Sequence, residues 1–303
     1  MKEVILAPMA GVTDKPFRQM VRLFGQHKLY TEMIGVESLS RNHPVTRKMM
    51  DIRDEKNIVV QLVGIHSDAM VQAAKIAQDM GAVGVDINMG CPVKKLISNG
   101  SGAALLKNPG MAADLVAQLK KNVQIPVSVK MRIGWDLDHI NALDFMKALE
   151  NAGVDLIAVH ARTKAEGYSG YPHFDIVREM KNQARVPIIV NGNMIDQQTA
   201  DTALSITQAD GVMIGRGALG KPWILSQIEK GETGSLDLEK IVIQHFDLLM
   251  NYYGHHGVFI ARKHLAWYAK GQKNVADFCQ SVYAETDSLK IKQMIHDFLG
   301  RKQ

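Results

Sequence analysis

The chain has 303 residues, of which 46% are hydrophobic and 22% are charged. This length suits about two domains, and the composition excludes a mainly disordered, collagenous or disulfide-stapled chain. The net charge of +5 is weakly basic, and by itself it identifies no class of partner.

Short apolar runs rich in Val and Ile alternate with helix-like segments, which predicts βα units and a parallel sheet. Eight such runs span residues 4–7, 28–32, 58–62, 83–88, 127–131, 156–160, 187–190 and 211–214. Ser67, Asn108 and Asp196 are the expected N-caps of three intervening helices. The pattern predicts an α/β fold, a (β/α)8 TIM barrel, which typically takes about 250 residues. An open doubly wound sheet is the alternative, but no GxGxxG follows the first run.

After residue 234 the strand pattern stops and helical periodicity takes over. Residues 231–235, GETGS, are the expected linker. Apolar residues then recur at helical spacing, at Val242, Phe246, Leu249, Tyr253, Ile291, Met294, Ile295 and Phe298. We therefore predict a barrel domain over 1–234 and a small helical domain over 235–303.

The cysteines and the N-terminus indicate the compartment. Cys91 and Cys279 lie in no CxxC or Cys/His pattern, so we expect reduced thiols and no metal site. The N-terminus has one basic residue before a short apolar run, and no stretch of about 18 apolar residues occurs. These features predict a cytoplasmic protein without membrane attachment.

Polar residues end most of the predicted strands, where a TIM barrel carries its active site. They include Gln61, Asn88, Cys91, Lys130, Arg132, His160 and Arg162. Each has a structural alternative. Gln61 could be an edge-strand residue, Lys130 part of an ion pair, His160 a core histidine, and Arg132 and Arg162 solvated rim charges. Their convergence on one rim favours a chemical role.

The last two strands end in glycine-containing turns. Asn191, Gly192 and Asn193 follow the seventh run, and Gly215 and Arg216 follow the eighth, just before a predicted helix. Glycines let backbone amides approach a phosphate, and an arginine can pair with the anion. Two structural turns are the alternative, but both clusters together predict a phosphorylated cofactor or substrate.

These segments resemble a known family. APMAGVTDKPFR, DINMGCPVKK, VKMRIGW, HARTKAEGYSG, IIVNGN and GVMIGRGALGKPWI are similar, in order and spacing, to the tRNA-dihydrouridine synthases, most of all to the bacterial B type. The resemblance implies a flavin enzyme that reduces uridine in tRNA, with bound FMN and with NADPH as reductant. The B-type likeness implies position 17 as the target.

The resemblance also implies roles for individual residues around FMN. Ala7, Pro8 and Met9 would line the flavin and Gln61 would bond its polar edge. Lys130, with His160 on the same edge, would stabilise the reduced form through its positive charge. The phosphate would be held by Asn191, Gly192, Asn193, Gly215 and Arg216. Asn193 departs from the acidic residue common in the family.

On the substrate side, the resemblance implies that Cys91 is the acid that protonates C5 of uracil. Asn88, Arg132 and Tyr168 are the expected contacts of the uracil edge. Two windows without acidic residues, 87–113 and 248–276, predict contacts with tRNA phosphates. The basic residues that we expect to bind tRNA are Lys94, Lys95, Arg262, Lys263 and Lys270, unless they form an ordinary solvated face. We expect a monomer.

Three other functions remain open. A flavin barrel could act on a free small molecule, as dihydroorotate dehydrogenases do, but the basic helical domain would then lack a purpose. Lys130 could form the Schiff base of an aldolase, which bound flavin would oppose. A noncatalytic RNA-binding protein is the third, and the polar barrel mouth argues against it.

Overall fold

Parallel strands close into a barrel in this computed structural model, which describes residues 2–231 and 234–300. The strands are β1 (Glu3–Leu6), β2 (Lys28–Tyr30), β3 (Ile34–Gly35), β4 (Ile58–Val63), β5 (Gly84–Met89), β6 (Val127–Arg132), β7 (Leu156–His160), β8 (Ile188–Asn191) and β9 (Gly211–Ile214). All neighbours pair in parallel, and the β2–β4 pairing closes the sheet. The predicted (β/α)8 TIM barrel is confirmed.

One position of the barrel is shared by two strands. The predicted second run, 28–32, ends as β2 at Tyr30, and the chain pairs again as β3 at Ile34. Both segments pair with β4, at Leu29 with Ile58 and at Ile34 with Leu62. β2 and β3 therefore form one interrupted strand, and the barrel keeps eight positions.

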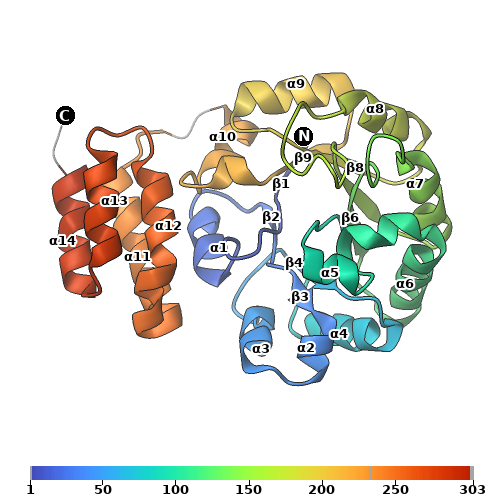
Figure 1. Ribbon diagram of the computed structural model, residues 1–303, viewed down its shortest axis with the longest axis horizontal. Helices are drawn as coiled ribbons and strands as arrows, with labels where there is room; N and C mark the ends of the chain where they lie inside the picture. Colours follow the sequence, from blue (N-terminus) through green and yellow to red (C-terminus); the bar gives the residue numbers. More distant parts are fainter. Residues whose placement is uncertain (1, 232–233, 301–303) are drawn as a thin grey trace.

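Helices surround the barrel (Figure 1). They are α1 (Lys15–Arg22), α2 (Val36–Ser40), α3 (Pro44–Met50), α4 (Ser67–Asp79), α5 (Lys94–Ser98), α6 (Pro109–Asn122), α7 (Ala142–Asn151), α8 (Phe174–Gln183), α9 (Gln197–Thr207) and α10 (Ile224–Lys230), with short 3-10 turns η1 (Gly102–Lys107) and η2 (Arg216–Ala218). The predicted caps Asn108 and Asp196 each accept a backbone hydrogen bond. Ser67 is wrong as a cap, because it is already the first helical residue of α4.

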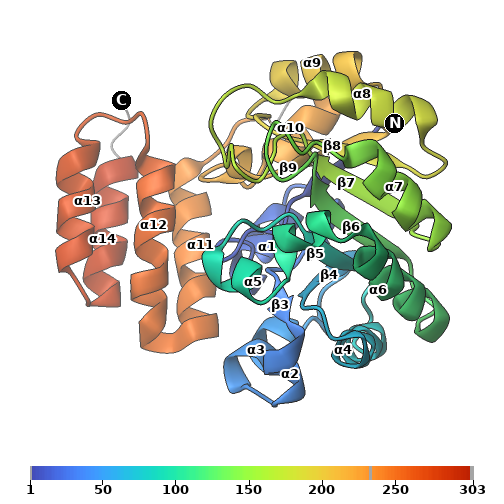
Figure 2. The ribbon, with the colours of Figure 1, turned by 45° about the vertical axis from the view of Figure 1, so that its right-hand side comes forward.

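The remaining helices form a separate group beside the barrel (Figures 1 and 2). They are α11 (Leu238–Tyr253), α12 (Gly257–Ala269), α13 (Val275–Ala284) and α14 (Ser288–Leu299), with the turn η3 (Gly254–His256). The periodic residues Val242, Phe246 and Leu249 are buried in a second hydrophobic core. The linker residues 232–233 lie outside the described residues, and the boundary at 234 stays a prediction that the separate core supports.

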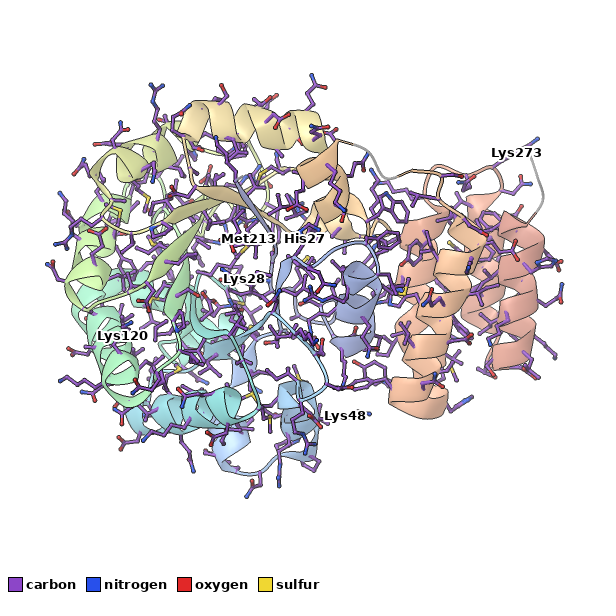
Figure 3. All side chains as sticks on the ribbon, turned by 180° about the vertical axis from the view of Figure 1, so that it is seen from behind. His27, Lys28, Lys48, Lys120, Met213 and Lys273 are labelled. Atoms are coloured by element: carbon purple, nitrogen blue, oxygen red, sulfur yellow. The ribbon has the colours of Figure 1, made fainter. Side chains whose placement is uncertain are left out.

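Helix α1 joins the two parts. Its Met20 belongs to the second core, and the ring centroid of its Phe17 lies 5.8 Å from that of His264. The hydroxyl of Tyr253 donates to Asp14 at 2.9 Å, just before α1. Lys48 reaches the end of α11, with its ammonium 4.1 Å from the centre of the Tyr252 ring (Figure 3). These contacts hold α11 and α12 beside the loop that follows β1.

Among the described residues, no helix combines the length and the apolar character that crossing a bilayer requires. The same part of the chain brings together no group of three or more His, Cys, Asp and Glu side chains suited to a metal ion.

Candidate active site

The turn that carries Cys91 is built by Asn88. Strand β5 ends at Met89, and the side-chain oxygen of Asn88 accepts hydrogen bonds from the backbone N–H of Gly90 at 3.1 Å and of Cys91 at 2.9 Å. Asn favours such turns because its short side chain reaches the backbone two or three residues later. Its amide nitrogen donates to Gln61 at 2.9 Å. Asn88 therefore fixes the position of Cys91 from the barrel wall.

Gly102 supports the same turn from the other side. The backbone N–H of Ala103 donates to the carbonyl of Cys91 at 3.0 Å. Gly102 has φ +62, and a Cβ added there would lie 2.8 Å from that carbonyl oxygen. Only glycine allows this close approach in a left-handed conformation. The partly buried thiol of Cys91 is thus held on a tightly packed loop.

Arg132 ties the Cys91 turn to the loop after β7. Its Nε donates to the carbonyl of Gly90 at 2.9 Å, and its Nη1 donates to the carbonyls of Thr163 at 2.7 Å and Gly167 at 2.8 Å. The side chain is 3% exposed. The alternative of a solvated rim charge is therefore wrong for Arg132, whose guanidinium organises two loops.

Arg162 is also buried, so the solvated-rim alternative is wrong for it too. It is fully inaccessible, and it donates to the carbonyls of Ser169 at 2.8 Å and Gly170 at 2.5 Å. These bonds fold the loop back toward the barrel and carry Tyr168. The Tyr168 ring lies 6.0 Å from His160 between ring centroids, and 4.4 Å from the Arg216 guanidinium carbon. Tyr168 therefore lies at the mouth, beside His160 and Arg216.

Lys130 lies at the barrel mouth, and few polar groups compensate its positive charge. Its ammonium donates one hydrogen bond, at 3.3 Å, to Asn191. No described carboxylate lies within ion-pair distance of it, so the structural ion-pair alternative is wrong. Burial lowers the pKa of Lys130 to about 8, against the attraction of Asp86 and Cys91. An anionic group bound beside Lys130 would stabilise its charged form.

A buried polar network lies beneath Lys130. Asp86, fully inaccessible on β5, accepts hydrogen bonds from Gln61 at 2.7 Å and from Ser128 at 2.7 Å. Burial raises the pKa of Asp86 to about 6. Gln61 is 1% exposed and bonds both Asp86 and Asn88, so it is a buried network member rather than an edge-strand residue. The network fixes the strand ends on which Lys130 and Cys91 depend.

The pKa of His160 reflects the positive charge of the mouth. Burial lowers its pKa to about 2, with further lowering by the positive charges of Lys130, Arg132, Arg162 and Arg216. The imidazole is therefore neutral at physiological pH and offers a hydrogen bond without a charge. The four cations make the mouth suited to an anionic ligand.

The predicted phosphate residues meet at the ends of β8 and β9. Gly192 has φ +142, where a side chain would be strained, and a Cβ on Gly215 would lie 3.8 Å from both Ala7 and Met9. The predicted flavin-lining and phosphate-binding segments, including Pro8, are therefore neighbours. Arg216 donates to Asn193 at 3.4 Å.

The Asn191 side chain already has two partners. It accepts from Lys130 at 3.3 Å and donates to the carbonyl of Met213 at 2.6 Å. The second N–H of its amide nitrogen is left to donate to a bound ligand.

The predicted tRNA-binding residues do not form one patch. Lys94 and Lys95 are exposed on α5, near Cys91. On α12, Arg262 donates to the carbonyl of Glu285 at 3.2 Å, within the helical group. Lys263 faces the barrel instead, with its ammonium 3.5 Å from the place of a Cβ on Gly11. Lys270 is exposed where α12 ends.

Sequence reasoning missed three parts of this site. Asp86 and Ser128 alternate with apolar residues on β5 and β6, and a carboxylate inside the run GVDIN was an available signal. The spacing of Asn88 and Cys91 in NMGC is that of an Asx turn, which predicts the observed capping of the turn. The contact of Gly102 with Cys91 joins residues eleven positions apart, and no local pattern announces it.

The parallel strands close into a barrel, and their ends bring together a lysine, a neutral histidine, a loop cysteine and a glycine-rich turn. These features define a TIM-barrel enzyme suited to a phosphorylated ligand. The chain belongs to the dihydrouridine synthase (Dus) family, whose model matches residues 5–299. The predicted family is confirmed.

Two relatives illustrate the likeness. The chain is 39% identical to a probable tRNA-dihydrouridine synthase of Rickettsia conorii, over 97% of this chain and 92% of that protein. It is 39% identical to tRNA-dihydrouridine synthase B of Pseudomonas syringae pv. tomato, over 88% of this chain and 82% of that one.

The fold is also similar to a solved 2-naphthoyl-CoA reductase, with a TM-score of 0.59 and 11% identity. The match covers 76% of this chain and half of that one, and at this identity it shows the shared fold alone.

Proposed function

We propose that this protein reduces a uridine in tRNA to 5,6-dihydrouridine, using FMN and NADPH. One observation carries the proposal: Cys91 stands on a turn fixed by Asn88 and Gly102, at the end of β5, which pairs with the strand that carries the partly buried Lys130. The names of the relatives support tRNA as the substrate.

The residues at the mouth fit FMN. Two glycine-containing turns and Arg216 offer backbone amides and a guanidinium to its phosphate. Within residues 2–231 and 234–300 the Lys130 ammonium donates one hydrogen bond, and it lies in a strongly positive environment. Such a cation suits the polar edge of a flavin that gains negative charge on reduction. Ala7, Pro8 and Met9 would line the ring, with Gln61 and His160 at its polar edges.

Saturating the C5=C6 bond of uracil needs a hydride at C6 and a proton at C5. The hydride would come from FMN bound at the mouth, with NADPH as the reductant that is oxidised to NADP⁺. Cys91 supplies the proton and is left as a thiolate, which solvent reprotonates. The Lys130 ammonium keeps the mouth positive, and His160 is neutral and has no proton to give at physiological pH.

Arg132 contributes to this step through Cys91 and Tyr168. Its Nε and Nη1 donate hydrogen bonds to the two loops on which these residues stand. Asn88 has its oxygen engaged by the turn. We propose that both residues place Cys91 and, with Tyr168, frame the uracil.

The tRNA would lie against both parts of the protein. The target base must leave its stack to enter the mouth, while its flanking phosphates stay outside. Lys94 and Lys95 on the barrel and Lys263 on α12 stand near the mouth. Arg262 and Lys270 would extend this contact along the helical domain, 235–303. We propose a cytoplasmic monomer that reduces position 17.

The test is direct. Purified protein should be yellow, release FMN on denaturation, and form dihydrouridine in tRNA with NADPH. Cys91→Ala should keep FMN and NADPH oxidation but lose at least about 99% of dihydrouridine formation, with Cys279→Ala as the matched control. A protein that takes up no FMN, or a fully active Cys91→Ala, would refute the assignment. Turnover of a free pyrimidine or dihydroorotate without tRNA would favour the small-molecule alternative.

A further inference from the structure

A cluster of two lysines on one tryptophan lies outside the residues used so far. The ammonium of Lys107 is 3.6 Å from the centre of the Trp135 ring, and the ammonium of Lys164 is 4.2 Å from it. The three residues come from different loops. Lys107 ends η1, Trp135 follows β6, and Lys164 follows β7.

The cluster is rigidly joined to the proposed active site. The backbone N–H of Lys164 donates to Gly134 at 2.9 Å, and that of Ala165 donates to Trp135 at 2.9 Å. Next to Lys164, the carbonyl of Thr163 accepts from Arg132. At its start, η1 is bonded to the Cys91 carbonyl through Ala103. The cluster therefore stands at a set place on the rim beside the Cys91 turn.

The charge of the two lysines is uncompensated. Neither makes an ion pair with a carboxylate of the described chain. Two acids of the same loops are engaged by other residues, Asp136 by His139 at 2.6 Å and Glu166 by Thr163 and His173, each at 2.8 Å. The indole ring attracts both ammonium groups but accepts none of their conventional hydrogen bonds.

The spacing of the two ammonium groups suits a phosphate. Because both distances start at one ring centre, the two nitrogens are at most about 8 Å apart. At this separation the two ammonium groups can contact one phosphate, or two successive phosphates of one RNA strand. Lys107 is exposed and Lys164 partly so, which leaves their N–H groups open to a ligand.

We propose that Lys107, Trp135 and Lys164 form a phosphate clamp that grips the RNA backbone next to the uridine entering the mouth. The inference rests on the proposed function, because only a polynucleotide substrate carries phosphates that stay on the rim while its base is buried. The clamp positions the nucleotide and takes no part in proton transfer.

The test compares the double variant Lys107→Gln/Lys164→Gln with Lys75→Gln/Lys147→Gln, which removes two exposed lysines from the outer helices α4 and α7. The clamp variant should bind tRNA about tenfold more weakly, and its plot of log affinity against log salt should be shallower by about one to two units. Trp135→Leu should give a smaller loss. FMN content and the KM for NADPH should match the control.

Equal tRNA affinity and salt slope in the two double variants would overturn the clamp. A raised KM for NADPH with unchanged tRNA binding would also overturn it, and would assign the site to the phosphate of the reductant. Wild-type protein that neither binds tRNA nor forms dihydrouridine would instead refute the proposed function itself.

Discussion

Replacing Gly102 by alanine should damage catalysis without removing the cofactor. The added Cβ would lie 2.8 Å from the Cys91 carbonyl oxygen, whereas ordinary contacts begin at 3.4 Å. The Cys91 turn must therefore retreat by about 0.6 Å, because the atom in the way is backbone. A displacement of about 1 Å at a reacting group can cost about 100-fold in rate, so we expect a loss of about 10-fold to 100-fold.

Gly100→Ala is the matched control. Gly100 also has a left-handed φ, +78, but a Cβ there would meet only Ile65 at 3.6 Å. Both variants pay about 1 kcal/mol for the left-handed conformation of a non-glycine residue. Gly102→Ala carries the clash with Cys91 in addition, so its melting temperature should fall further than that of Gly100→Ala.

The assay is single-turnover formation of dihydrouridine by protein loaded with FMN and reduced beforehand. Gly102→Ala should be slow and Gly100→Ala close to wild type, with equal FMN content. Equal rates in the two variants would refute the view that Gly102 sets the position of Cys91.

Three further predictions concern Arg132, Lys130 and the buried histidines. Arg132→Lys should keep FMN but slow dihydrouridine formation about tenfold, because one ammonium cannot bond the three carbonyls that the guanidinium bonds. Arg178→Lys, at an exposed position, is the control, and equal slowing of the two variants would contradict this prediction. Lys130→Met should lower the midpoint potential of bound FMN, measured by dye-coupled titration, and an unchanged potential would place Lys130 away from the flavin. Burial lowers the pKa of His245 to about 3 and that of His264 well below its usual value. Below about pH 6.5 the unfolded chain therefore binds more protons than the folded protein, and the free energy of unfolding decreases as the pH falls. Urea unfolding at pH 7 and pH 5 should show a smaller loss for His264→Phe than for wild type, by up to about 2 kcal/mol, and equal losses would mean that His264 is protonated in the folded protein.

Much of the fold followed from local patterns. Apolar runs at strand length, separated by amphipathic helices, specify βα units, and their number specifies the barrel. The caps Asn108 and Asp196 act within three residues, so the sequence alone reveals them. The break of β2 before β3 was not predicted, because it depends on pairing with β4 rather than on hydrophobicity.

For the site, the sequence by itself determined which residues end the strands and therefore which meet at one rim. It could not show how their side chains are engaged. Asn88 and Arg132 were expected at the uracil, and the structure directs most of their hydrogen bonds to backbone groups of the loops. Side-chain partners are chosen by tertiary distance, which a linear pattern does not encode.

Tertiary structure alone decided the contact of Gly102 with Cys91 and the gathering of Lys107 and Lys164 on Trp135. These residues lie on loops that differ in length and have no periodicity. Their positions are set by the closed barrel, which brings the ends of β5, β6 and β7 to one rim. The sequence determines the order of the strands, whereas the distances between their loops are set only when the sheet closes into a barrel.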